Sequence, residues 1–429
     1  MWTAVTLENY RSFVAPTTIE LKPLTLFFGL NNAGKSALLR ALPLLASSIR
    51  HPDAPLDLAS PAARGASFSD ILTRPPLRTS NRLKFSMAFG GYVNSVQRSF
   101  RANWTLLELA EDNRHIVEQF QINDDDAQIL DAVIDLGSDN IEAWKLHQVT
   151  LRGKPCGALD LEFEGLLPAA NSTSFNEVDD LLSNLRSELL STQTLVQWIS
   201  SVRVRPERLT TFSGSRPRFL GPEGQAAAEV LAYDKEVLSN VSQWFEAHTN
   251  RRLLTVPVGE HFQLVLETLN SNPVRVPLID AGEGLAQVLP VLVAAEMAKI
   301  AHRNSPRILS IEEPESHLHP RFHAALAERF CSIATSPSPP QIVLETHSEI
   351  VLLELQYQIA AELLDPKNVI VYWVYSNPSG QSLIERIEFD AFGRPKDGQS
   401  FPHGVFSEDT AQAKKLLAKQ KERINAGNR

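Results

Sequence analysis

A lysine and a serine follow a glycine-rich stretch near the start of the chain, and together these residues could hold a phosphate. The segment GLNNAGKS (29–36) fits the pattern G-x-x-x-x-G-K-[ST]. Its glycines let successive backbone N–H groups point at one centre, and a helix that begins there adds partial positive charge. The predicted chemistry is therefore binding of ATP and Mg²⁺, with Lys35 on the β- and γ-phosphates and Ser36 on the metal.

The nucleotide-binding residues expected from this segment are Gly29, Asn31, Asn32, Ala33, Gly34, Lys35, Ser36 and Ala37. The alternative is a plain glycine turn between a strand and a helix. The apolar run before the loop and the helical spacing after it favour the phosphate site.

A pair of acids follows another apolar run. In RILSIEEPESHLHP (307–320), ILSI has the length of a buried strand, and Glu312 and Glu313 stand at its end. One acid can orient Mg²⁺ and its waters, and the other can take a proton from the attacking water. Acid pairs are common on surface loops, so this pair alone is a weak indication of a nucleotide site. Together with the phosphate loop it is a strong one.

The segment QIVLETHSEIVL (341–352) repeats that arrangement and ends its apolar run before Thr346 and His347. His347 could contact the γ-phosphate or hold the water. The structural alternative is that the histidine merely precedes a helix capped by Ser348. In DAGEGLAQVLP (280–290), glycines precede a long apolar helix, whose first N–H groups also suit an anion.

Strands and helices alternate around these segments, so the predicted fold class is α/β. The phosphate loop joins a strand at 24–28 to a helix at 36–45, and the acids follow a strand at 308–311. Ligands of α/β folds bind at the carboxyl ends of such strands. We therefore expect the loop and the acids to meet at one edge of a mixed sheet.

The nucleotide core is expected to be split along the chain. Residues 1–50 and 270–380 would form the core, residues 51–269 an inserted lobe, and residues 381–429 a C-terminal extension. Within the insert, alternating apolar residues predict an antiparallel β subdomain, and a helical pattern predicts a helical part; the segments are 82–93, 99–109 and 175–190. The basic segment 411–429 suggests an amphipathic helix.

Taken in order, ENYRSF, GLNNAGKS, DAGEGLAQVLP, IEEPESHLHP and ETHSE resemble the motifs of ATP-binding-cassette (ABC) ATPases of the SMC/RecF/OLD branch. The resemblance covers residues 1–45 and 275–355 well, and it is weaker through 199–209 and 219–234. The ending at 389–409 is similar to that of stand-alone members found in bacterial defence loci. The implied fold is an ABC-ATPase head with a P-loop mixed sheet, an antiparallel β subdomain and a helical inserted lobe.

The resemblance implies a nucleotide held between two heads of a homodimer or higher oligomer. It assigns phosphate and Mg²⁺ binding to Lys35 and Ser36, help with the metal to Glu312, and the roles of general base and γ-phosphate sensor to Glu313 and His347. The signature residues expected to touch the partner's nucleotide are Asp280, Gly282 and Gly284. Two departures stand out: Glu312 replaces the usual aspartate, and Ala281 replaces a serine donor. Loss of that donor, worth roughly 1.5–3 kcal/mol, predicts slow hydrolysis.

Two further activities are not expected of this chain. The histidines of HLHPRFH (317–323) could bind a metal, but the resemblance already explains that segment. OLD nucleases carry a Toprim domain after the ATPase, whereas the residues after His347 show no metal-binding acid cluster. We therefore expect a separate effector, a nuclease or toxin, to carry any destructive chemistry in antiviral defence.

Composition points to a protein of the cytoplasm. The chain has 429 residues, enough for about two to three domains. Cys156 and Cys331 cannot build a disulfide framework, and no run of about 18 apolar residues suggests a membrane span. The first residues show no secretion signal, and no sustained heptads suggest long coiled-coil arms.

Nucleic-acid binding remains open at this point. The net charge of −9 opposes a protein coated for DNA, yet one basic groove is compatible with it. The candidate strip for phosphate contacts consists of Arg203, Arg205, Arg208, Arg216 and Arg218. The alternative functions are thus a RecF-like DNA-binding repair ATPase and a scaffold that binds ATP without hydrolysing it.

Overall fold

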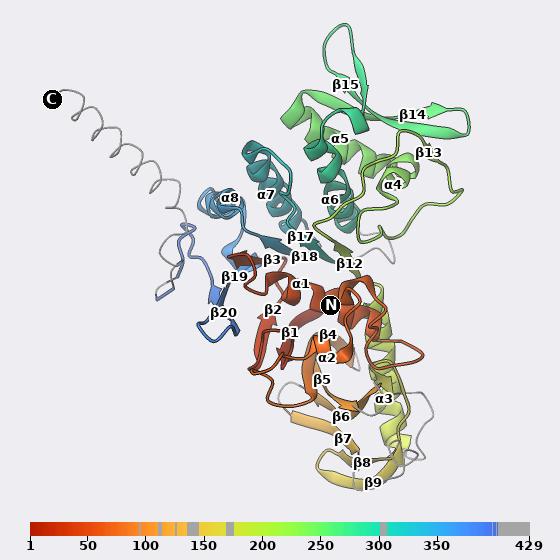
Figure 1. Cartoon of the computed structure of the whole chain (residues 1–429), viewed down its shortest axis with the longest axis vertical. Coiled ribbons are helices and arrows are strands. Elements are labelled where there is room, and N and C mark those ends of the chain that lie inside the picture. The colour runs from red at the N-terminus through yellow and green to blue at the C-terminus, as the bar shows by residue number, and fades with distance from the viewer. Residues whose placement is uncertain are drawn as a thin grey trace, which may run out of the picture.

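The computed structural model describes residues 1–93, 96–109, 114–124, 127–134, 146–168, 176–300, 307–396, 398–399 and 401, except for the side chains of 91–93, 96–98 and 179. The segment 411–429 lies outside this range, as do residues 397, 400 and 402–409 of the ending at 389–409 that resembles defence proteins. Figure 1 shows an elongated molecule with a central sheet, an antiparallel sheet at one end and a smaller lobe at the other.

A six-stranded mixed sheet occupies the centre, in the order β12-β17-β18-β3-β19-β20. All neighbours are parallel except the edge strand β20, which is antiparallel to β19. The strands are β12 (Val196–Ile199), β17 (Ile308–Glu312), β18 (Gln341–Thr346), β3 (Leu24–Gly29), β19 (Val369–Ser376) and β20 (Ser382–Ile387). The phosphate loop follows β3, and β18 lies between β3 and β17.

Helices cover both faces of this sheet, so its central strands β3, β17 and β18 are buried along their whole length and are mainly apolar. Helix α1 (Lys35–Ser48) packs on one face, against β3, β12, β17 and β18. Helices α6 (Glu283–Ile300), α7 (Pro320–Ala334) and α8 (Glu349–Ala360) lie on the other side, where α6 contacts β17 and α7 contacts β18. Alternate residues enter separate cores: Ile308 and Val343 pack on the α1 side, Leu309 and Leu344 on the α7 side.

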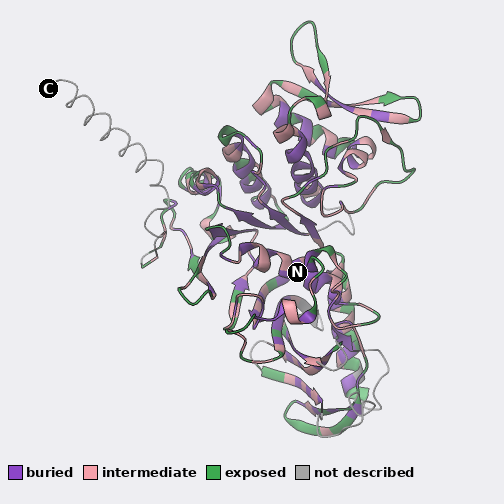
Figure 2. Cartoon of the chain, viewed as in Figure 1, coloured by how far each residue is buried: buried purple, intermediate pink, exposed green. Residues whose placement is uncertain are grey.

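The second large sheet is antiparallel and has the order β2-β1-β4-β5-β6-β7-β8-β9. Helix α3 (Asn176–Gln193) lies beside it in Figure 1. Its strands are β1 (Trp2–Glu8), β2 (Thr17–Glu20), β4 (Arg82–Val93), β5 (Val96–Leu109), β6 (Arg114–Asp124), β7 (Ala127–Ile134), β8 (Leu146–Leu151) and β9 (Lys154–Asp160). Figure 2 shows exposed residues gathering on its outer strands.

A third lobe packs its helices against α6. It contains α4 (Ala227–Tyr233), α5 (Lys235–Thr249), β13 (Thr210–Thr211), β14 (Arg251–Val258), β15 (His261–Thr268) and β16 (Arg275–Pro277). The remaining elements are short: α2 (Phe68–Ile71), β10 (Phe163–Glu164), β11 (Leu167–Pro168), η1 (Pro61–Ala63), η3 (Leu278–Asp280) and η4 (Pro366–Asn368).

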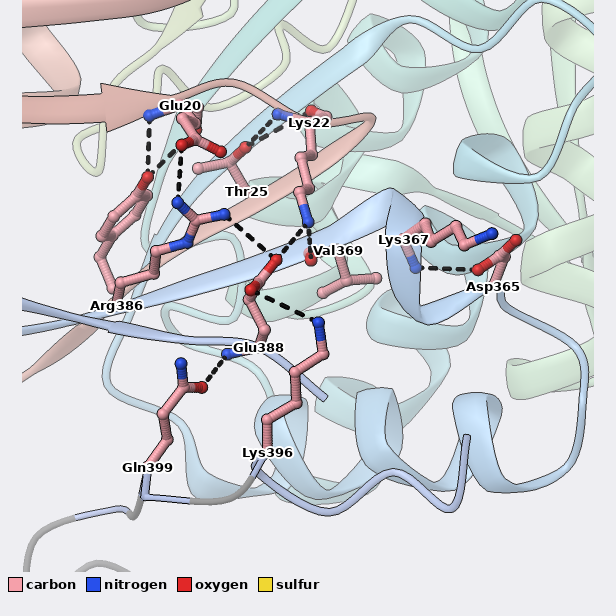
Figure 3. A network of polar contacts seen from close by, with 11 residues as sticks. Glu20, Lys22, Thr25, Asp365, Lys367, Val369, Arg386, Glu388, Lys396 and Gln399 are labelled. Atoms are coloured by element: carbon pink, nitrogen blue, oxygen red, sulfur yellow. Dashed lines mark hydrogen bonds and ion pairs between the residues drawn. The ribbon is translucent and has the colours of Figure 1, made fainter. Parts of the chain in front are cut away.

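Charged residues tie the outer edge of the central sheet to the N-terminal strands. Glu388 accepts from Lys22 (2.9 Å) and Arg386 (3.2 Å) and lies 3.5 Å from Lys396, as Figure 3 shows. Arg386 also pairs with Glu20 at 2.6 Å. These contacts join β2, β20 and the segment after β20.

The predicted mixed α/β architecture is confirmed, including the antiparallel β subdomain and the helical part. Several elements cross the domain limits expected from sequence. Strand β12 lies within 51–269 and β20 within 381–429, yet both pair in the central sheet, whereas β1 and β2 lie within 1–50 and pair in the antiparallel sheet. The division into domains therefore stays a prediction. No helix of the described residues has both the length and the apolar character needed to cross a bilayer.

Candidate functional site

The loop between β3 and α1 has the backbone expected of a phosphate cradle. Gly34, the residue before α1, is left-handed (φ 102°), and no side chain caps the helix. The first turn of α1 contains no acid, so its free N–H groups remain available to an anion. A Cβ at Gly29 would lie 2.1 Å from the Val374 carbonyl oxygen, so only glycine fits where the loop leaves the sheet.

Lys35 occupies the inside of this loop. Its side chain is buried, and its amine donates to the carbonyls of Gly29 (2.9 Å) and Leu30 (2.8 Å). Burial lowers the pKa of Lys35, and the nearby carboxylates of Glu345 and Glu313 oppose that shift. The lysine thus lies near carboxylates from two other segments of the chain.

Glu312, at the end of β17, is fully engaged with two other side chains. Arg40 of α1 donates to both of its carboxylate oxygens at 2.6 Å, and the Trp198 indole donates to one of them at 3.0 Å. Only 2% of Glu312 is exposed. Because the guanidinium neutralises the carboxylate, burial of this charge is compensated.

Glu345, on β18, reaches the phosphate loop itself. The Ser36 hydroxyl donates to its Oε1 at 2.6 Å, and its Oε2 has no hydrogen-bond partner within the described residues. Burial raises the pKa of Glu345 to about 7, and the charge of Glu312 adds to that shift. Sequence analysis gave Glu345 no role, although it stands directly before Thr346 at the end of a predicted strand.

The backbone holds Glu313 in an unusual conformation. Its φ is 41°, and its N–H donates to the Glu345 carbonyl at 2.8 Å. Arg203, which is buried, donates to the carbonyls of Glu312 (2.6 Å) and Glu313 (2.9 Å). The Glu313 side chain is half-buried and makes no hydrogen bond within the described chain, which leaves its carboxylate available.

The turn after β18 is fixed by Glu315. Its Oε1 accepts from the Thr346 hydroxyl (2.6 Å) and from the His347 N–H (3.3 Å). The His347 side chain is exposed, and Ser348 caps α8 by accepting from the Val351 N–H. The helix-cap alternative is thus realised, and it leaves the imidazole at the same sheet edge as the acids.

The signature segment lies at the start of α6, and its contacts are with other parts of the chain. Arg208 binds both oxygens of Asp280 at 2.8 Å, and a Cβ at Gly284 would lie 2.6 Å from the His317 carbonyl oxygen. Gly282 is left-handed (φ 108°) with open space around it. Among the described residues, no hydrogen bond joins this segment to the phosphate loop.

Most of the predicted arginine strip is engaged within the chain. Arg203 is buried beneath Glu312, Arg205 pairs with Glu283 at 2.5 Å, and Arg216 pairs with Asp234 at 2.5 Å. The ion pairs of Arg205, Arg208 and Arg216 neutralise much of the positive charge that phosphate binding needs, and Arg203 is buried. The DNA contact stays a prediction.

A basic cavity missed by the sequence analysis borders α1. It has a volume of about 350 Å³ and is lined by Tyr10, Asp70 and four arginines, of which Arg40 pairs with Glu312 and Arg74 with Asp70; the other two are Arg11 and Arg64. Arg11 belongs to the ENYRSF segment, and it is left-handed (φ 54°). Such a cavity beside the phosphate loop favours a negatively charged ligand.

Two residues of the histidine-rich segment 317–323 make contacts within the fold. His319 caps α7, and His323 contacts the Ser348 hydroxyl at 2.9 Å. In the described part of the chain, no group of three or more His, Cys, Asp or Glu residues is arranged to hold a metal. These contacts support a structural role for the segment, in capping α7 and packing against the start of α8.

The donor set at the loop fits Mg²⁺ and a nucleotide. Hydroxyl and carboxylate oxygens are the ligands that Mg²⁺ takes, and it usually keeps waters and phosphate oxygens beside them. Ser36 and Glu345 supply such oxygens, and the partnerless Oε2 of Glu345 is a buried acceptor that a metal-bound water would satisfy.

Comparison with known proteins gives one family. Residues 24–354 match the family described as "AAA domain, putative AbiEii toxin, Type IV TA system". This match spans 331 of the 429 residues. No curated protein sequence matches the chain.

Three solved structures of SMC heads align along most of the chain. The SMC head bound to the C-winged helix domain of ScpA is 12% identical, with 91% of this chain and 98% of that chain covered and a TM-score of 0.48. The SMC head domain from Thermotoga maritima is 10% identical, with 90% and 99% covered and a TM-score of 0.45. The Pyrococcus furiosus SMC head with an extended coiled coil, bound to the C-terminal domain of ScpA, is 10% identical, with 98% and 99% covered and a TM-score of 0.49.

Proposed function

Because the chain belongs to the AAA-domain family whose members match residues 24–354, we propose that it is an ATPase that binds Mg²⁺ and ATP beside α1. The observation that carries this proposal is the meeting of Ser36 with a carboxylate from β18, 2.6 Å away but 309 residues further along the chain. Lys35, Glu313 and His347 lie at the same edge of the sheet. These are the groups that phosphoryl transfer to water requires.

Each residue has a separate role in this proposal. Lys35 exchanges its contacts with the Gly29 and Leu30 carbonyls for phosphate oxygens, and the N–H groups at the start of α1 hold the same phosphates. Glu313 accepts a proton from the attacking water, and His347 lies where it can orient the γ-phosphate. Bound Mg²⁺ neutralises charge on the phosphates.

Nucleotide binding is tested with Lys35→Ala. The substitution removes the amine inside the loop, and we expect ATP affinity measured by calorimetry to be abolished. Lys367→Ala is the matched control, because that lysine is exposed on η4 and lies outside the site. Equal ATP affinity in wild type and Lys35→Ala would refute the proposal.

Hydrolysis is tested separately from binding. Glu313→Gln should retain ATP and lose turnover, because an amide does not accept the proton. The wild-type rate should be low, since Ala281 offers no hydroxyl where signature segments usually carry serine. Equal rates in wild type and Glu313→Gln would instead favour a scaffold that binds ATP without hydrolysing it.

We further propose that ATP draws two heads together. Asp280, Gly282 and Gly284 would contact the nucleotide held by the second head, and this is compatible with the open space around Gly282. Light scattering of Glu313→Gln with and without ATP measures this step. A mass that does not change with ATP would exclude nucleotide-driven dimerisation.

The role assigned to head closure is control of a separate nuclease or toxin in antiviral defence. The family description, which names a toxin and a type IV toxin–antitoxin system, supports such a setting. The RecF-like alternative receives less support, because Arg203, Arg205, Arg208 and Arg216 have partners within the chain. Co-purification with a neighbouring gene product tests the effector, and a salt series of DNA binding tests the alternative.

A further inference from the structure

Two carboxylates compete for the position beside the metal, and the sheet register separates them. Glu312 and Glu345 are paired residues of the parallel strands β17 and β18. Both point to the α1 side, since they keep the alternation of Ile308 and Val343. Strand β18 lies between β17 and β3, so Glu345 is one strand closer to the phosphate loop.

Both carboxylate oxygens of Glu312 already accept hydrogen bonds. Arg40 takes both oxygens at 2.6 Å, and Trp198 adds a third hydrogen bond at 3.0 Å. A cation at this carboxylate would have to displace a guanidinium in a buried place, which leaves a buried positive charge without its partner.

Glu345 is in the opposite situation. Its Oε1 accepts a hydrogen bond from the Ser36 hydroxyl, and its Oε2 is buried without a partner among the described residues. A hydroxyl that donates to a carboxylate keeps its own lone pairs available for a cation. Ser36 and Glu345 therefore present adjacent hard oxygen donors, which suit Mg²⁺.

We propose that Glu345, and not Glu312, is the carboxylate that positions Mg²⁺ beside Ser36, and that Glu312 is a positioning residue that anchors Arg40 and Trp198. This inference rests on the proposed binding of Mg²⁺ and ATP. The metal role moves from Glu312 to Glu345 for a structural reason. The carboxylate on β17 is bound by an arginine, whereas the carboxylate on β18, the strand next to β3 and the phosphate loop, is still available.

The test compares Glu345→Gln with Glu312→Gln, using a non-hydrolysable ATP analogue. Calorimetry gives the affinity of the analogue with and without Mg²⁺, and electron paramagnetic resonance gives Mn²⁺ binding to the protein with the analogue bound. Glu345→Gln should lose about tenfold or more of the gain that Mg²⁺ brings, while its metal-free affinity stays near that of wild type. Glu312→Gln should keep the gain and lower the melting temperature.

Glu296→Gln is the matched control for a buried carboxylate that pairs with arginine. Glu296 is 1% exposed and bound to Arg329 at 2.6 Å, between α6 and α7. It should behave like Glu312→Gln, with lower stability and an unchanged Mg²⁺ gain. If Glu345→Gln does not fold, Glu345→Ala removes the same carboxylate and should lose the same Mg²⁺ gain.

The outcomes are distinguishable. Loss of the Mg²⁺ gain in Glu312→Gln, alone or together with Glu345→Gln, would overturn the inference, as would a full gain in Glu345→Gln. A wild-type protein that binds no analogue at all would refute the proposed function and this inference with it.

Discussion

The central sheet and the antiparallel sheet differ in how deeply their charged residues are buried. Every residue of β3, β17 and β18 is buried, whereas β8 and β9 alternate or are largely exposed. A glutamate at the end of a buried strand loses its water and must find a partner inside the protein. In the antiparallel sheet, pairs such as Lys84–Glu8 stay near solvent, where each contributes little.

The difference shows where chemistry can develop. Buried strand ends concentrate carboxylates beside the phosphate loop, in surroundings that strengthen their interactions with a cation and shift the pKa of Glu345 to about 7. In the described part of the antiparallel sheet no Asp or Glu is buried, although His115 on β6 is. Substitutions of the same kind should therefore have larger effects in the central sheet.

The largest contrast is expected from replacing a glycine by alanine. At Gly29, the new Cβ would collide with the Val374 carbonyl oxygen at 2.1 Å, so β3 and β19 must separate. We expect a loss of roughly 4 kcal/mol and no ATP binding. Gly153→Ala in the β8–β9 turn meets open space, and only its positive φ (77°) costs stability, about 1 kcal/mol. Urea unfolding measures both, and equal losses would contradict the comparison.

The sequence predicted three adjacent strands of the central sheet, β3, β18 and β17, because the cues are local. The glycine pattern, the apolar runs and the acids at their ends lie within a few residues of one another. The partners of the acids could not be predicted, since Arg40 and Trp198 lie 272 and 114 residues from Glu312. Their meeting depends on strand order, which no local pattern encodes.

The second contrast concerns leucines. Leu309 on β17 is fully buried between the sheet and the α6–α7 layer, and Leu309→Ala should cost about 3 kcal/mol through the cavity it leaves. Leu146 on β8 is 41% exposed, and Leu146→Ala should cost less than about 1 kcal/mol. The urea midpoints of the two variants measure these losses of stability. A larger loss in Leu146→Ala than in Leu309→Ala would contradict the comparison.

The third prediction concerns pH at the outer edge of the central sheet, where ion pairs are only partly covered. The hydrogen bond from Lys22, followed by that from Arg386, lowers the pKa of Glu388 to about 2. Since this is below its ordinary value of 4.5, the pairs stabilise the fold fully above about pH 4.5 and lose their effect as pH falls toward 2.

Glu388→Gln should thus lower the free energy of unfolding by about 1 kcal/mol at pH 7, a value limited by solvent screening. The difference from wild type should shrink in urea unfolding between pH 7 and pH 3. Glu385→Gln on the exposed side of β20 is the control and should show no such trend. A difference that stays constant over this range would remove the pH argument.

The smallest expected effect is on thiol reactivity. One cysteine lies on a helix that covers the central sheet, and the other lies on a strand of the antiparallel sheet. Cys331 on α7 is buried, and burial raises its pKa to about 12, so almost no reactive thiolate exists at pH 8. Cys156 on β9 is only partly buried. A disulfide reagent should modify Cys156 rapidly in the native protein and Cys331 only after urea is added. Cys156→Ala should remove the rapid phase, and two thiols reacting at one rate in native protein would show that α7 does not shield its cysteine.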